Sequence, residues 1–116
     1  MAPEYAEILS GVAAALEPLG FEFVEHKSFL CVLGKSDRFV VLEGEPRVRG
    51  AFGLGIAQSW PVAPDFIFSL RLLMQVFGEN ERPSLQNQLN FLISHMEDIF
   101  CNLSAYVPQY RKLNGE

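Results

Sequence analysis

Histidine is the side chain best suited to proton transfer near neutral pH, and this chain has two, His26 and His95. His95 and Asp98 lie three residues apart in a segment with helical periodicity, so both side chains share one helix face. Such a pair supplies two metal ligands, or a histidine oriented by a carboxylate. A metal site needs a third ligand, and no motif in the sequence indicates one. We therefore interpret His95 as a surface histidine beside acidic residues.

Motifs for nucleophilic catalysis and phosphate binding are also missing from the sequence. No serine lies in a nucleophile-elbow pattern. Residues 50–55 are rich in glycine, but a phosphate-binding loop needs its glycines between a strand and the start of a helix. Cys31 and Cys101 form no CxxC motif and each lies in an apolar pattern, which predicts two buried free thiols. We expect no enzymatic activity, no cofactor and no metal site.

Two features of the sequence suit contact with another protein. Neutral amides begin the polar face of the last predicted helix, and amides lose less than charges do when a partner covers them. Trp60 is followed by Pro61 and Pro64, which restrict the backbone of this connector, and tryptophan commonly anchors interfaces. The predicted partner contacts are Trp60, Gln86, Asn87 and Asn90, with Gln88 on the same amide face.

The composition is that of a folded, acidic protein. Of the 116 residues, 49% are hydrophobic and 20% are charged, which excludes a disordered chain. The net charge of −5 disfavours nucleic acid and anionic membranes and favours a basic partner. The length indicates one domain, residues 1–116. Without a signal-peptide pattern or an apolar run of roughly 18 residues, we expect a cytoplasmic location.

Basic residues gather in the middle of the chain, where they could be taken for a nucleic-acid patch. They are Lys27, Lys35, Arg38, Arg47 and Arg49. Acidic residues are interleaved with them and cancel most of the field that phosphate binding needs. We therefore expect a mixed, solvated sheet surface.

The elements that must position these residues begin with a helix. Apolar residues recur at helical spacing over residues 3–17, and Pro18 and Gly20 end the pattern. Four strand-like runs follow at residues 21–25, 29–33, 38–43 and 48–57, joined by turns too short for crossover helices. In the last run, Gly53 and Gly55 share a face that is small or solvated.

Two helices are expected to complete the fold. Asp65 is a candidate cap for a helix over residues 66–77, closed by Gly78, and Ser84 for a long final helix. Residues 66–77 are apolar nearly all round, which is typical of a core helix or of half of a homodimer interface. Residues 105–116 are expected to be a loosely ordered tail. The predicted class is α+β, with an N-terminal helix, an antiparallel sheet of about four strands and two C-terminal helices packed on one face.

This order of elements resembles a family of small α+β proteins. The helix, the Leu19-Gly20-Phe21 junction and the meander up to residue 45, followed by residues 89–95 in a closing helix, are similar to bacterial immunity proteins that are paired with secreted toxins. The resemblance implies a stoichiometric inhibitor that covers a toxin's active site. It carries over no functional residue, because it rests on the pattern of elements and on no diagnostic motif.

Two other classes remain open. The first helix, the hairpin over residues 29–43 and the apolar second helix resemble the dimeric acidic chaperones of type III secretion effectors. Those chaperones usually insert strands before their final helix, and the gap at residues 78–83 is too short for them. A third class is a small-ligand protein or enzyme, with Trp60, His26 and Cys31 near an apolar cavity.

Overall fold

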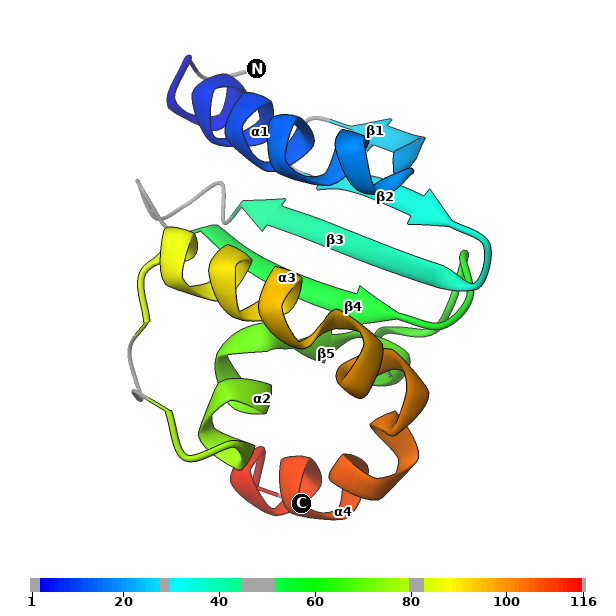
Figure 1. Ribbon diagram of the computed structural model, residues 1–116, viewed down its shortest axis with the longest axis vertical. Helices are drawn as coiled ribbons and strands as arrows, with labels where there is room; N and C mark the ends of the chain where they lie inside the picture. Colours follow the sequence, from blue (N-terminus) through cyan, green and yellow to red (C-terminus); the bar gives the residue numbers. More distant parts are fainter. Residues whose placement is uncertain (1–2, 28–29, 45–51, 80–82, 116) are drawn as a thin grey trace.

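The chain begins with helix α1, Pro3–Leu16, extended by one turn of 3-10 helix, η1, Glu17–Leu19. The computed structural model describes residues 3–27, 30–44, 52–79 and 83–115 (Figure 1). Gly20 ends the helical segment with a φ of 96°, the left-handed conformation that glycine adopts at little steric cost. The predicted N-terminal helix and its ending at Gly20 are therefore confirmed.

Five antiparallel strands form one sheet in the order β1-β2-β3-β4-β5. Their bounds are Glu22–Lys27, Leu30–Lys35, Arg38–Gly44, Phe52–Ala57 and Phe68–Ser69. The first four overlap the predicted runs, but β1 and β2 each extend two residues further than expected, to Lys27 and Lys35. The expected beginnings at residues 29 and 48 lie outside the described residues. The sheet has one strand more than the four expected, because Phe68 and Ser69 pair with Ile56 and Gly55 of β4.

This fifth strand corrects the helix expected over residues 66–77. The segment forms a 3-10 turn, η2, Pro64–Phe66, then β5, and becomes α-helical only in α2, Leu70–Val76. An apolar run without periodicity does not separate a strand from a helix, and here the sheet offers ladder hydrogen bonds and a buried site for Phe68. Gly78 closes α2 with a φ of 81°, as expected.

Two helices complete the chain, α3, Leu85–Cys101, and α4, Leu103–Leu113. Ser84 caps α3 as predicted, since its Oγ accepts a hydrogen bond from the N–H of Asn87 at 3.1 Å. The segment expected to be a loose tail is helical as far as Leu113. Tyr110 holds it in place, because its ring is buried and its hydroxyl accepts a hydrogen bond from the N–H of Ser69 at 2.8 Å.

The helices pack against one face of the sheet. Figure 1 shows α1 and α3 lying across the strands, with α2 and α4 beyond β5. Alternate strand residues such as Leu33, Val40, Leu42 and Ile56 point into this helix-packed core. The intervening residues form what we call the outer face. Its described strand residues are Glu22, Val24, Glu25, Lys27, Leu30, Val32, Gly34, Phe39, Val41, Glu43, Gly53, Gly55, Ala57 and Ser69.

Candidate functional site

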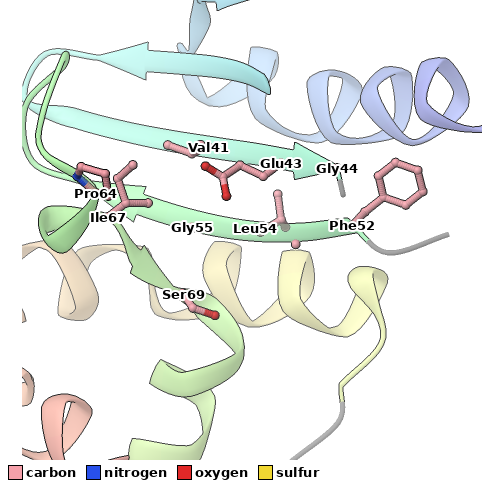
Figure 2. A pocket seen from close by; sticks show the side chains of 10 residues that line it. Val41, Glu43, Gly44, Phe52, Leu54, Gly55, Pro64, Ile67 and Ser69 are labelled. Atoms are coloured by element: carbon pink, nitrogen blue, oxygen red, sulfur yellow. The ribbon is translucent and has the colours of Figure 1, made fainter. Parts of the chain in front are cut away.

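The outer face contains a trough along β4. Val41 and Glu43 of β3 stand opposite Gly55 and Gly53 of β4, so side chains on one strand face bare backbone on the next. The resulting hollow has a volume of about 460 Å³ and is bounded on the far side by Pro64, Ile67 and Ser69 (Figure 2). The small face that the sequence predicted for this strand is therefore the floor of a binding-sized depression.

The two glycines of the floor have different roles. A Cβ on Gly55 would lie 3.0 Å from Cγ2 of Ile67, so the absence of a side chain lets Ile67 pack down onto the sheet. A Cβ on Gly53 would meet no atom within 4 Å. The trough is therefore closed by Ile67 at one end and open above Gly53.

Charge on the outer face is mainly negative. In Figure 2 the carboxylate of Glu43 extends along the strands toward Ile67, over the trough. Glu22 and Glu25 lie on the same face in β1, where Glu25 pairs with Lys27 at 3.5 Å. The described strands thus place three carboxylates and one ammonium group on this face. Val32 and Val41 at its centre are covered, with exposed fractions of 0% and 1%, whereas Val24, which lies over Gly34, is 49% exposed.

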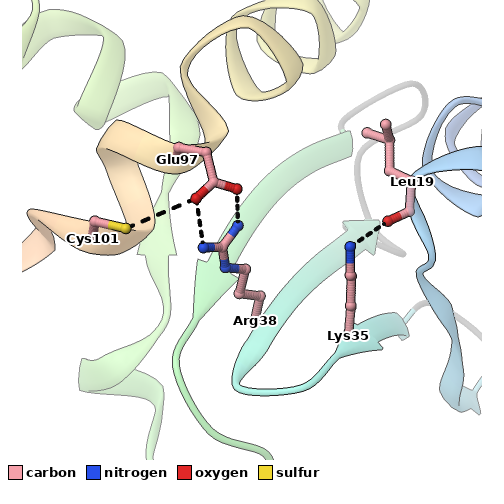
Figure 3. A network of polar contacts seen from close by, with 5 residues as sticks. All are labelled: Leu19, Lys35, Arg38, Glu97 and Cys101. Carbon is pink, nitrogen blue, oxygen red and sulfur yellow. Dashed lines mark hydrogen bonds and ion pairs between the residues drawn. The ribbon is translucent and has the colours of Figure 1, made fainter.

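The other described cations of the middle segment lie on the helix side of the sheet (Figure 3). Arg38 donates two hydrogen bonds to the carboxylate of Glu97, at 2.6 and 2.9 Å, and Lys35 donates to the carbonyl of Leu19 at 2.9 Å. The bond from Arg38 holds the pKa of Glu97 below its usual value and raises that of Arg38. Arg47 and Arg49 lie outside the described residues.

The histidine and carboxylate singled out in the sequence have separate partners. The centroid of the His95 ring lies 4.6 Å from the centroid of the Phe91 ring and 5.3 Å from that of the Phe77 ring. Asp98 instead accepts hydrogen bonds from Asn102 and Tyr106, both at 2.8 Å, and these lower its pKa. His95 is accordingly half-buried rather than a plain surface histidine. Among the described residues, no three potential metal-binding side chains gather.

The two cysteines differ in environment, which corrects the expectation of two buried thiols. Cys31 is fully buried, and burial raises the pKa of its thiol. Cys101 is exposed at the end of α3, on the same side of the helix as Glu97, to which its Sγ donates at 3.9 Å. The apolar pattern around residue 101 belongs to its neighbours, and the cysteine falls on the charged face.

The predicted contact residues lie on two separate surfaces. Gln86, Asn87 and Asn90 are exposed on α3, with the Gln86 amide donating to Oδ1 of Asn90 at 2.9 Å. Trp60 is half-buried in the connector between β4 and β5. The structure thus brings the three amides together but does not join them to Trp60.

Gln88 is the exception within the amide face and is buried, with 5% of its surface exposed. Its Oε1 accepts a hydrogen bond from the N–H of Leu54, and its Nε2 donates to the carbonyl of Pro83, both at 3.3 Å. A signal for this existed in the sequence, because position 88 is three residues after Leu85 and so falls toward the inward stripe of the helix.

A second hollow, of about 580 Å³, lies between the connector after β4 and helix α4. Its lining includes Val62, Phe66, Phe68, Leu103, Val107 and Arg111. Phe66 is the large apolar side chain with the highest exposed fraction among the described residues, 58%. Trp60, His26 and Cys31, expected beside an apolar cavity, line neither this hollow nor the trough.

Comparison with protein-family models, with curated proteins and with solved structures found no match to this chain. None of the described helices combines the length and the apolar character needed to cross a membrane. The candidate site is accordingly defined by geometry and charge alone, and the trough of the outer face is its centre.

Proposed function

We propose that this protein is a cytoplasmic protein-binding domain that presents its outer face to a basic partner, as an immunity-type inhibitor of a bacterial toxin would. One observation carries the proposal. The outer face lies outside the helix-packed core, and its described strands carry three carboxylates, one ammonium group and the exposed side chain of Val24. Protein interfaces likewise combine apolar and polar side chains.

The charge of the face supports a basic partner. Glu22, Glu25 and Glu43 outnumber Lys27 among its described residues, and the whole chain carries a net charge of −5. Opposite charges raise the association rate and disfavour acidic competitors. A toxin that acts on an anionic substrate has cations in its active site, so an acidic face that covers those cations would block catalysis.

The first test compares charge-reversed variants as bait. Wild type, Glu43→Arg and a matched control, Glu17→Arg, are immobilised and exposed to lysate of the source organism. Glu17 is exposed in η1, on the helix side, so the control makes the same change of charge away from the outer face. Support is one stoichiometric basic protein that wild type and Glu17→Arg retain and Glu43→Arg loses, and whose toxicity co-expression of wild type suppresses.

Other results overturn the proposal. Equal retention by Glu43→Arg and wild type would remove the outer face as the contact. An Asn90→Arg variant adds a third arm, because Asn90 belongs to the exposed amides of α3. Loss of the partner in that arm alone would move the interface to the amide face. A captured protein without toxicity would remove the inhibitor role.

A chaperone that dimerises through residues 66–77 has less support from the fold. Leu70, Leu72, Leu73 and Met74 of α2 are buried within the chain's own core. Phe66 is the large apolar residue of this range that stays well exposed. Light scattering at micromolar concentration measures the oligomeric state. A monomer would exclude this class of chaperone, because its members are obligate dimers.

The second hollow favours a small-ligand role as the alternative. Most of its lining is apolar, and it includes Arg111, whose guanidinium lies 6.0 Å from the centroid of the Phe68 ring, a combination suited to an apolar carboxylate. A thermal-shift screen with medium-chain fatty acids tests this role. Stabilisation by the acids and not by the matching alcohols would favour it over the protein-binding role.

A further inference from the structure

The first strand of the sheet has an open edge. β1 is the terminal strand and, among the described strands, pairs only with β2. An edge strand directs backbone N–H and C=O groups away from its one neighbour, where a further strand can bind them. We propose that β1 pairs antiparallel with β1 of a second copy of this chain. This pairing goes beyond the protein-binding role of the outer face, because it joins two sheet edges and leaves both outer faces uncovered.

A bulge gives β1 the same order of faces in both directions. The register with β2 shifts between Phe23 and Glu25, so Val24 is the extra residue. Phe23 and His26 stand opposite core residues of β2 and therefore lie on the helix side of the sheet. Residues 22, 24, 25 and 27 lie on the outer face. From either end the strand thus reads outer, helix side, outer, outer, helix side, outer.

This order of faces fits a twofold axis perpendicular to the sheet. Directly opposed side chains of an antiparallel pair lie on the same face, and β1 meets this condition when all six of its residues are aligned with a second copy. Each pair below joins a residue of one copy to a residue of the other and occurs twice: Glu22 with Lys27, Phe23 with His26, and Val24 with Glu25. A regular strand would place the members of each pair on opposite faces, so the bulge makes this register possible.

The charges of β1 favour a second copy over a strand of another sequence. Glu22 and Lys27 are both exposed and carry opposite charges. Lys27 lies 3.5 Å from Glu25 of its own chain, and its ammonium has three donors, so it can also bind Glu22 of the second copy. Charged side chains on an edge strand usually oppose pairing with other strands. Here their order is complementary to itself, which makes them a device for selecting the same sequence.

The remaining residues of the edge supply apolar contact. Phe23 and Val24 are each 49% exposed. Within one copy the rings of Phe23 and His26 stack, with centroids 6.2 Å apart and an interplanar angle of 22°. The proposed register places a second such pair directly opposite, and aromatic cross-strand pairs stabilise a sheet. Six residues from each copy form a small interface, so we expect a weak, reversible dimer.

Charge reversal with complementation is the central test. Sedimentation equilibrium of the wild type, from about 10 μM to about 1 mM, should show a reversible monomer–dimer equilibrium. Glu22→Lys and Lys27→Glu each place two like-charged pairs across the axis, so each variant alone should dimerise at least about tenfold more weakly. An equimolar mixture of the two variants should recover the dimer, because both pairs again join opposite charges.

Glu7→Lys is the matched control. Glu7 is exposed on α1, and it lines a hollow beside the beginning of α3 rather than β1. Both Glu7→Lys and Glu22→Lys lower the net negative charge of the chain, so relief of general repulsion would strengthen the dimer in both variants. We expect Glu7→Lys to dimerise at least as strongly as wild type and Glu22→Lys to dimerise more weakly. Effects of the same sign would overturn the proposal.

Isotope-filtered NMR on mixed ¹³C-labelled and unlabelled wild type tests the register directly. Contacts between the ring of Phe23 in one copy and that of His26 in the other support it. Contacts between copies at other segments alone would overturn it. A wild type that stays monomeric over the whole concentration range, or a mixture no more dimeric than the separate variants, would do the same. A dimer that Glu22→Lys leaves intact and Phe66→Asp removes would place the contact at residues 66–77 and also overturn the proposal.

Discussion

The side-chain Oε1 of Gln88 accepts a hydrogen bond from the backbone N–H of Leu54 at 3.3 Å. β5 pairs only with Gly55 and Ile56, so the ladder beside β4 stops one residue before Leu54. The amide of Gln88 takes the place of the missing strand, and its Nε2 donates to the carbonyl of Pro83. A single side chain thus joins the beginning of α3 to the strand that floors the trough.

We predict that Gln88→Leu lowers the free energy of unfolding by about 1–3 kcal/mol, because it leaves the buried N–H of Leu54 without an acceptor. Urea unfolding at pH 7 measures the change. Gln86→Leu is the matched control on the exposed side of the same helix and should stay within about 0.5 kcal/mol of wild type. Similar effects of the two substitutions would contradict the role of Gln88.

Helix α2 provides a test of the core. Leu73 has no exposed surface, so Leu73→Ala should cost about 2–5 kcal/mol through lost burial and a cavity. Ile93→Ala, at a position 38% exposed, should cost about 0.5 kcal/mol or less. Chemical denaturation of both variants provides the comparison, and a negligible cost at Leu73 would disprove the packing of α2 against the sheet.

Ionisation of the Tyr5 hydroxyl makes the free energy of unfolding depend on pH in the alkaline range. Burial, with smaller effects of the charges on Cys31 and Glu43, raises its pKa from 10.0 to about 12. A raised pKa in the folded state means that this group's contribution is complete below pH 10 and is lost as the pH rises toward 12. Tyr5→Phe removes the bond from the Tyr5 hydroxyl to the carbonyl of Leu42, so wild type should be about 0.5–1.5 kcal/mol more stable at pH 8. This advantage should shrink at pH 11, and a constant difference in urea unfolding would refute the linkage.

Protonation of Glu97 makes the free energy of unfolding depend on pH in the acidic range, where stability is lost as the pH falls. Its pKa lies below the ordinary 4.5, mainly because Arg38 donates hydrogen bonds to its carboxylate. The contribution of this pair is therefore present above pH 4.5 and is lost as the pH falls through the lowered pKa. NMR titration of the Glu97 carboxyl carbon should show that Arg38→Gln moves the pKa up toward 4.5. Lys35→Gln should move it less, since Lys35 acts only through a weaker, longer-range charge. Equal movements would show that the bidentate contact is not the cause.

The amino-acid sequence by itself determined those elements whose signals are local. The run of apolar residues at helical spacing predicts α1, and Gly20 marks its end. Short turns between β-branched runs predict an antiparallel meander, and Ser84 predicts the cap of α3. In each case neighbouring residues in the sequence supply the interactions that decide the local conformation, and the tertiary structure is consistent with it.

The tertiary structure alone decided the conformation of those segments in which non-local contacts outweigh local preference. The segment around Phe68 is apolar enough for a helix or a strand, and pairing with the free edge of β4 made Phe68 and Ser69 a strand. The C-terminal segment lacks a strong local pattern, and burial of Tyr110 against Phe68 made it helical. The trough depends on β3 lying beside β4 and on Ile67 folding over Gly55, two relationships between residues distant in the chain. A pattern in the sequence indicates which face of a strand carries small side chains, but only the packing of distant segments decides which residues surround that face.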